Sequence, residues 1–300
     1  MNGFPAAGSV LLVDIGNTRI KWAVWRAGRL GRQRAEVYAD WTPEDFARHV
    51  FRRRGATRAR APARIIVASV ADEGVLRRLQ TGARRTSGSV RASRLRLRSS
   101  GVAAFERIET SRRAAGVVTR YREPWRLGVD RFLGVIAAHH IAGSRAACVI
   151  NAGTAVTIDF VDGRGVHRGG AILPGPRLMI ESLLLRTAGI ARRAGAPRGA
   201  RSASPARDRG RMNVRLGTRS ARFLARDTAT AIELGAANAV AGAVERAIAA
   251  SSRELEGATP LVVLTGGGSA ELRRLLHTPC IDVPDLVLRG IAVHAGLALR

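Results

Sequence analysis

The chain has 300 residues and a formal net charge of +27, and 46% of its residues are hydrophobic, enough to bury a core in one large or two medium domains. No apolar run reaches the roughly 18 residues of a membrane span, and the N-terminus shows no basic and apolar leader, so we expect a cytoplasmic protein without membrane association. The two cysteines, Cys148 and Cys280, provide no disulfide framework and no metal-ligand spacing, as expected in a reducing compartment.

The positive charge comes almost entirely from arginine, since Lys21 is the only lysine among 50 basic residues. With the abundance of Ala and Gly, this bias indicates genome-wide base composition more than selection for a nucleic-acid surface. The arginines cluster at 84–98 and 192–226, which predicts a salt-sensitive, non-specific affinity for polyanions. Aromatic residues are only 4% and are not interleaved with these arginines, so we treat nucleic-acid binding as incidental.

The first predicted elements form a β-hairpin bent around a glycine. An apolar strand over 10–13 runs into the turn Asp14-Ile15-Gly16-Asn17-Thr18. An alternating β-branched run follows over 20–25, which is typical of the second strand of a hairpin.

The rest of the chain alternates helices and strands, the pattern of an α/β protein. The predicted elements are a helix over 43–54 capped by Thr42, a buried strand over 64–70, a helix over 130–141, strands over 147–150 and 156–161, a helix over about 228–250, a strand over 261–265 and a helix over about 286–299. Residues about 192–222, rich in Arg, Gly, Ser, Ala and Pro, are predicted to form a long flexible loop.

The hairpin occurs twice. The second apolar strand runs into Asn151-Ala152-Gly153-Thr154, and Asn151 follows Asp14 by 137 residues, a spacing the size of a domain. Each turn brings backbone N–H groups, a hydroxyl and a carboxylate or amide into one place, which suits a polyphosphate with its cation. The pattern favours a duplicated, phosphate-binding kinase.

The sequence lacks the residues that other phosphate-binding motifs require. A Walker A loop needs Gly-Lys-Ser/Thr and a protein kinase needs a lysine with a separate His-Arg-Asp loop, but Lys21 is followed by Trp22. A dinucleotide-binding fold needs Gly-x-Gly-x-x-Gly after the first strand, where Gly16 is a single glycine.

Six short blocks stand out along the chain. They are Asp14-Ile15-Gly16-Asn17-Thr18; Tyr121 with Leu127-Gly128-Val129-Asp130-Arg131; Gly153-Thr154-Ala155-Val156-Thr157; Gly169 to Gly175 with Met179 and Ser182-Leu183; Asp227-Thr228-Ala229-Thr230-Ala231-Ile232; and Thr265-Gly266-Gly267. In this order, over about residues 10–292, they closely resemble type III pantothenate kinases. That group includes the Bvg accessory factors and belongs to the superfamily of acetate and sugar kinases, Hsp70 and actin.

The resemblance implies an α/β fold of duplicated ribonuclease H-like (actin-like) domains with a central cleft, divided here into residues 1–142 and 143–300. It implies ATP-dependent phosphorylation of pantothenate to 4′-phosphopantothenate, the first step of coenzyme A biosynthesis. The implied cofactors are ATP with Mg²⁺ and a monovalent cation, K⁺ or NH₄⁺. A homodimer is implied as well, because in relatives the pantothenate pocket lies at a two-fold interface.

The resemblance assigns the catalytic aspartate to Asp130, where a carboxylate can take the proton of the acceptor hydroxyl. Arg131 could hold an anionic or hydroxylated part of pantothenate, although Asp130 and Arg131 could instead cap the helix that begins here. The implied substrate-binding residues are Tyr121, Gly128, Val129, Asp130, Arg131 and Thr228. Thr228 is also compatible with the first turn of a helix capped by Asp227.

The resemblance also implies a set of ATP-binding residues. They are Asp14, Ile15, Gly16, Asn17, Thr18, Arg19, Ile20, Lys21 and Thr154. In this assignment Asp14 acts through the metal and its waters, and Lys21 contacts a terminal phosphate. The alternatives are that Asp14 and Asn17 only shape the hairpin, since Asn and Asp favour turns, and that Lys21 is a solvated strand side chain.

Asn151 departs from the family pattern, because relatives usually carry an aspartate here, thought to ligate the monovalent cation. An amide oxygen can coordinate K⁺ but lacks the formal charge, so potassium affinity is in question. Gly169 to Gly175 lets the backbone approach a ligand closely, unless it forms an ordinary loop. Gly266 to Gly268 fits either a close approach of adenosine or a simple tight turn.

A second hypothesis is a regulatory accessory protein of the same fold that binds nucleic acid or a partner through its arginine clusters. The presence of Asp14, Asp130 and Arg131 favours the enzyme.

Overall fold

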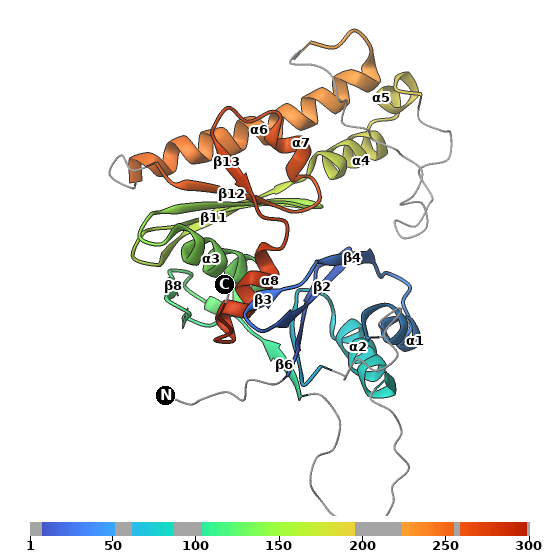
Figure 1. The fold of residues 1–300 in the computed structure, drawn as a ribbon. Helices are drawn as coiled ribbons and strands as arrows, with labels where there is room; N and C mark the ends of the chain where they lie inside the picture. Colours follow the sequence, from blue (N-terminus) through green and yellow to red (C-terminus); the bar gives the residue numbers. More distant parts are fainter. Residues whose placement is uncertain (1–7, 52–61, 87–103, 196–223, 255–258, 299–300) are drawn as a thin grey trace, which may run out of the picture. The chain divides into compact units, whose positions relative to one another are not determined.

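The computed structural model describes residues 8–51, 62–86, 104–195, 224–254 and 259–298 (Figure 1). The chain divides into two compact units, which are treated separately below. Unit 1 comprises residues 1–116, 121–137 and 285–300, and unit 2 comprises residues 117–120 and 138–284.

Unit 1 contains a six-stranded mixed sheet. Its strands are β1 (Val10–Ile15), β2 (Arg19–Arg26), β3 (Arg29–Leu30), β4 (Arg34–Val37), β5 (Arg64–Ser69) and β6 (Ala104–Ile108), in the order β3-β2-β1-β5-β6, with β4 paired to β2. The central strand β1 is buried along its whole length, because β2 pairs with it antiparallel and β5 pairs with it parallel. Leu11, Val13 and Ile15 enter one core cluster, so the alternation of a strand turns Asp14 to the opposite face.

Among the described residues, six helical segments lie wholly or mostly in unit 1. They are α1 (Pro43–Phe46), η1 (Ala47–Phe51), α2 (Glu73–Thr86), η2 (Pro124–Arg126), α3 (Val129–Ala142) and α8 (Leu286–His294). Residues 285–300, at the C-terminal end of the chain, belong to unit 1. The reason is α8, which buries Leu286, Leu288 and Ile291 and contacts β1, β2 and β5.

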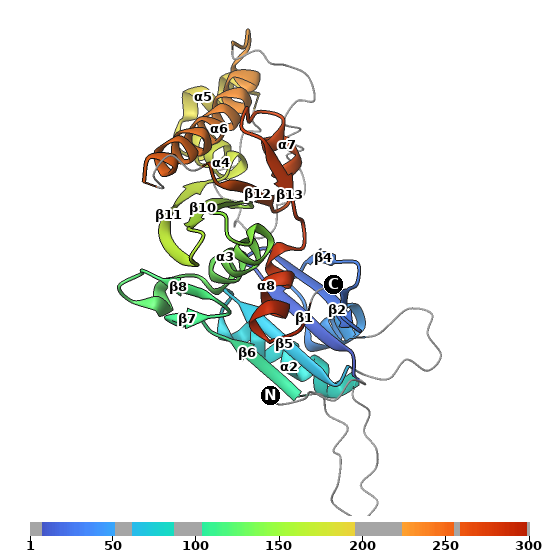
Figure 2. The same cartoon turned by 60° about the vertical axis from the view of Figure 1, so that its left-hand side comes forward.

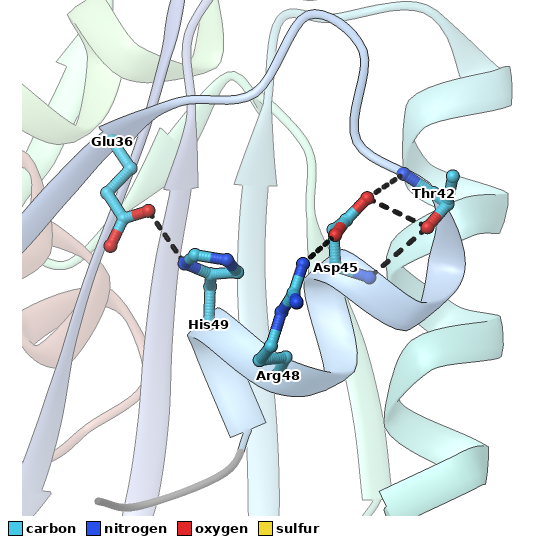
Figure 3. Close-up of polar contacts among 5 residues, drawn as sticks. All are labelled: Glu36, Thr42, Asp45, Arg48 and His49. Atoms are coloured by element: carbon cyan, nitrogen blue, oxygen red, sulfur yellow. Dashed lines mark hydrogen bonds and ion pairs between the residues drawn. The ribbon is translucent and has the colours of Figure 1, made fainter.

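The first predicted helix begins where expected. Thr42 and Asp45 form a capping box: the Asp45 N–H donates to the Thr42 hydroxyl at 3.3 Å, and the Thr42 N–H donates to the Asp45 carboxylate at 3.0 Å (Figure 3). The helix passes from α1 into the π-helical turn η1, where His49 contacts Glu36 of β4 at 2.9 Å (Figure 3). Residues 52–54 of the predicted helix lie outside the described residues.

The second sheet belongs to unit 2 apart from its short end strand β7. Its strands are β7 (Arg113–Ala114), β8 (Val117–Thr119), β9 (Ala147–Ala152), β10 (Ala155–Val161), β11 (Val166–Pro174), β12 (Leu261–Thr265) and β13 (Cys280–Asp282), in the order β13-β12-β9-β10-β11-β8-β7. Strand β9 is antiparallel to β10 and parallel to β12. Since β1 has the same relation to β2 and β5, the predicted repeat of the hairpin is confirmed.

The described part of unit 2 contains four helices, of which α6 is the longest. They are α4 (Pro176–Arg186), α5 (Ala188–Arg193), α6 (Thr228–Glu254) and α7 (Ser269–Arg273). Val240, Val244 and Ile248 of α6 pack into one core with Ile150 and Ile158 of the sheet, and α4 and α7 lie on the same side (Figures 1 and 2).

Two predicted boundaries need correction. The loop predicted over about 192–222 begins later, because α5 continues through Arg193, and residues 196–222 lie outside the described part. The last helix ends at His294 rather than near 299, because Gly296 takes φ +69° and the N–H groups of Gly296 and Leu297 turn back to carbonyls of the final turn. No helix in the described ranges is long and apolar enough to cross a membrane.

Candidate active site

The first predicted phosphate-binding turn places an acid and a base side by side. Asp14 and Lys21 are direct partners in the β1–β2 register, and the Lys21 Nζ lies 3.5 Å from the Asp14 Oδ2. Asp14 is only 4% exposed, and its burial raises its pKa from 3.8 to about 6. Lys21 lowers this pKa, and the carboxylate of Asp130 raises it further, so the two predicted acids of unit 1 interact electrostatically.

The turn between β1 and β2 is held by one backbone hydrogen bond and one side-chain hydrogen bond, both to Gly16. The Gly16 N–H donates to the Arg19 carbonyl at 3.0 Å, and the Tyr38 hydroxyl donates to the Gly16 carbonyl at 2.5 Å. Ile15 and Ile20 are fully buried core residues, so neither of these two predicted ATP-binding residues has surface open to a ligand.

The other predicted residues of this turn are nearer to solvent. Asn17 and Arg19 are exposed, and Thr18 is half-buried. Sequence reasoning missed Tyr38, because its contact with Gly16 spans 22 residues and follows no motif spacing.

Asp130 lies in the first turn of α3, where the helix begins as predicted to within one residue. Its Oδ1 accepts the backbone N–H of Arg131 at 2.8 Å. The carboxylate also lies close to Gly128, since a Cβ added to Gly128 would stand 2.8 Å from Oδ1. A side chain at position 128 would therefore displace the Asp130 carboxylate, which lies at the positive end of the helix dipole.

Arg131 and Tyr121 form a contact that links the two ends of one sequence block. The Arg131 Nη1 donates to the Tyr121 hydroxyl at 3.0 Å, and the guanidinium carbon lies 5.7 Å from the ring centroid. Arg131 is 7% exposed and Val129 is buried beside it. The contact with Tyr121 orients the Arg131 guanidinium, whose five N–H donors form a rigid fork.

The second turn gathers the remaining glycine blocks inside unit 2. The Gly153 N–H donates to the Ala155 carbonyl at 3.0 Å, and Thr154 beside it is exposed. The Gly175 N–H donates to the Thr154 carbonyl at 2.9 Å, and a Cβ on Gly175 would stand 2.6 Å from that oxygen. Gly175 therefore has to be glycine because the backbone of the turn passes so close to it.

Asn151 lies at the end of β9, opposite Thr265 of β12. Gly266 follows with φ +96°, and a Cβ there would stand 2.7 Å from the Asn151 Oδ1 and overlap the Ala152 carbonyl. The Gly268 N–H donates to that same carbonyl at 2.9 Å. The amide oxygen of Asn151 thus lies against the Gly266 backbone, near the Ala152 carbonyl oxygen.

Thr228 is the first residue of α6, as one of the two predicted roles requires. The Asp227 carboxylate accepts the Thr230 N–H at 2.8 Å, which together with further hydrogen bonds lowers the pKa of Asp227. This hydrogen bond caps the helix and leaves the half-buried Thr228 in its first turn.

The structure therefore brings Asp14, Lys21 and Asp130 together in unit 1, and Asn151, Thr154 and the glycine blocks together in unit 2. Among the described residues there is no group of three or more His, Cys, Asp or Glu side chains that could hold a metal ion. A cation bound by these residues would accordingly have at most two such side chains as ligands, and the remaining ligands would be neutral oxygens or a bound phosphate.

Comparisons with known proteins agree with this arrangement. A model of the family described as type III pantothenate kinase matches residues 10–250. The type III pantothenate kinase of Alkalilimnicola ehrlichii is 34% identical over 284 residues, covering 94% of this chain and 96% of that protein. The type III pantothenate kinase of Halorhodospira halophila is 36% identical over 289 residues, covering 94% and 95%.

A solved structure shares the fold. Component A of (R)-2-hydroxyglutaryl-CoA dehydratase from Acidaminococcus fermentans covers 96% of this chain and 96% of its own, with a TM-score of 0.50 and 12% identity. With the repeated sheets, this likeness shows the expected α/β fold of duplicated ribonuclease H-like (actin-like) domains. On its sequence, the chain belongs to the type III pantothenate kinase family.

Proposed function

We propose that this protein catalyses its family's reaction, ATP-dependent phosphorylation of pantothenate to 4′-phosphopantothenate, with Asp130 as the base. Family membership makes it a kinase of coenzyme A biosynthesis that acts on pantothenate. We place it in the cytoplasm. The observation that supports the residue roles best is the electrostatic coupling of Asp14 to both Lys21 and Asp130.

Asp130 takes the proton of the pantothenate hydroxyl as that oxygen attacks the terminal phosphorus. The phosphoryl group moves from ATP to the oxygen, and ADP leaves. The Asp130 carboxylate is oriented by the backbone N–H of Arg131, which donates to its Oδ1 at the start of α3. Arg131, oriented by Tyr121, binds a polar part of pantothenate, and Thr228 contributes a hydroxyl to the same substrate.

The first turn binds the ATP phosphates with Asn17 and Thr18, and Lys21 contacts the terminal phosphate. The side chains here offer the oxygens of a carboxylate, an amide and a hydroxyl as metal ligands, and such hard oxygen ligands suit Mg²⁺. Asp14 would hold Mg²⁺ through its waters, and the ion would supply charge neutralisation at the phosphates. Before any cation binds, the Lys21 ammonium partly neutralises the negative charge of the Asp14 carboxylate.

Asn151 and nearby peptide carbonyl oxygens form the donor set for K⁺ or NH₄⁺, and Thr154 contacts the nucleotide beside them. All of these oxygens are neutral, and neutral carbonyl-type oxygens are adequate ligands for K⁺. The ion would supply positive charge beside the second turn. Without the aspartate expected from the family, Asn151 holds it more weakly.

The protein acts as a homodimer in this proposal. Leu178 and Leu185 are seven residues apart on one face of α4, and they are 40% and 55% exposed. Ile172 of β11, which precedes α4, is 62% exposed. A second copy of the chain would remove this apolar surface from water.

The activity is tested by measuring ADP release with ATP, Mg²⁺, K⁺ and pantothenate. Turnover that requires pantothenate is expected. No turnover, with DNA binding that is selective for sequence and survives in salt, would contradict the enzyme and favour the regulatory hypothesis.

A further inference from the structure

Tyr38 touches the first turn but belongs to none of the six blocks. It follows β4, and its hydroxyl donates the 2.5 Å hydrogen bond to the Gly16 carbonyl. Gly16 stands between Asp14 and Asn17, so this contact reaches the middle of the turn from a distant part of the chain.

The Tyr38 ring is held firmly. Tyr38 is 4% exposed and lies in the core cluster that contains Ile15, Ile20 and Phe46. Its ring centroid lies 6.4 Å from that of Phe46, and its carbonyl accepts the Trp41 N–H at 2.9 Å. Because ring and backbone are both fixed, the hydroxyl is presented to Gly16 from a rigid base.

The contact with Gly16 sets the direction of the next N–H group. The Gly16 carbonyl and the Asn17 N–H belong to one planar trans peptide, so they point in opposite directions. Because the Gly16 carbonyl accepts the hydrogen bond from the buried Tyr38, the Asn17 N–H points away from the core. Since glycine has few steric restraints, this peptide would rotate more easily without the Tyr38 hydroxyl.

We propose that Tyr38 is a positioning residue for nucleotide binding, which acts through the Gly16 carbonyl to hold the Asn17 N–H where it receives a phosphate oxygen. The proposal rests on the proposed function, in which the ATP phosphates occupy this turn. Donors that are already oriented bind a polyphosphate without a further ordering cost.

The surroundings of Tyr38 keep its hydroxyl a donor. Burial and the carboxylates of Asp72 and Asp14 raise its pKa, while Arg78 lowers it, and the net effect is upward. The phenol therefore stays protonated at neutral pH.

The test is Tyr38→Phe, which keeps the ring and removes the hydroxyl. We expect the Kd for ATP, measured by calorimetry, to rise about 5- to 20-fold, the effect of one lost hydrogen bond, and the KM for pantothenate to stay within about twofold. Thr42→Ala is the matched control, since it removes the nearby helix cap without touching Gly16. It should lower the melting temperature and leave ATP affinity unchanged.

Equal ATP affinity in Tyr38→Phe and the parent would overturn the proposal, as would an equal weakening in both variants. A parent that binds ATP but does not phosphorylate pantothenate would refute the proposed function and leave the role of Tyr38 standing. A parent that does not bind ATP would refute both.

Discussion

The Asp14 carboxylate faces the Lys21 ammonium at 3.5 Å, from the one position in β1 where a charged residue interrupts an apolar strand. The hairpin register makes the two residues direct partners, on the face turned away from the core that holds Ile15 and Ile20. Even with this partner, burial keeps the pKa of Asp14 high. Such a perturbed acid is typical of a functional site, because a bound cation would stabilise its charged form.

Asp14→Asn should stabilise the protein at neutral pH. The folded-state pKa of about 6 lies above the ordinary 3.8, so the folded state binds the proton more tightly and ionising Asp14 costs stability. That cost is absent below about pH 4, grows up to about pH 6 and then stays constant. At about 1.4 kcal/mol per pH unit it reaches about 3 kcal/mol. Urea unfolding at pH 4 and pH 8 measures the difference.

Asp45→Asn is the control of opposite sign. The capping box with Thr42 lowers the pKa of Asp45, so its stabilisation is present above pH 4 and is lost as the pH falls through the lowered value. This variant should be less stable than the parent at pH 8. If Asp14→Asn were also less stable than the parent at pH 8, ionisation of the buried Asp14 carboxyl would not cost stability, and the prediction would be contradicted.

Gly175→Ala should destabilise unit 2 by about 2–4 kcal/mol. A Cβ would stand 2.6 Å from the Thr154 carbonyl, and backbone has to move to make room. The comparison is Gly189→Ala in α5, where the nearest atom is a flexible arginine nitrogen at 3.9 Å, and this change should be neutral or slightly stabilising. The melting temperatures of the two variants measure the difference. Equal melting temperatures would contradict the prediction.

Asn151→Asp should lower the K⁺ concentration that gives half-maximal rate. A carboxylate adds a formal negative charge to a donor set that consists of amide and carbonyl oxygens. The rate is measured against K⁺ at constant ionic strength, with Li⁺ as the replacement ion. An identical K⁺ requirement in variant and parent would refute a cation role for Asn151.

Leu185→Glu should convert a dimer into a monomer, because a charge on the exposed face of α4 cannot be buried against a second copy. Light scattering after size-exclusion chromatography measures the mass. Ile281→Glu on β13, another exposed apolar position, should leave the dimer intact. A parent that already has the mass of one chain would rule out the homodimer.

Local patterns predicted much of this fold. Strand alternation predicted both hairpins, and Thr42 predicted the start of α1, because these signals depend on neighbours in sequence. Helix α2 was not predicted, although Val75, Leu76, Leu79 and Ala83 form a buried face at helical spacing; six of its 14 residues are arginines or threonines. The sequence predicted a helix in the region of α8 without indicating which sheet it would pack against.

In the candidate site, too, local sequence patterns predicted some features and tertiary packing determined the others. The turns and the Asp130 block could be found from residue types in order. The contacts that orient them, Tyr38 with Gly16 and Arg131 with Tyr121, depend on tertiary packing that spacing does not encode.

The most direct test of the central claim is a paired measurement on Asp130→Asn. The substitution keeps the size of the side chain and removes the proton acceptor, so ATP should bind with a Kd within about twofold of the parent while turnover with pantothenate falls by about 10²–10⁴-fold. A variant that keeps turnover within about tenfold of the parent would contradict the assignment of Asp130 as the base.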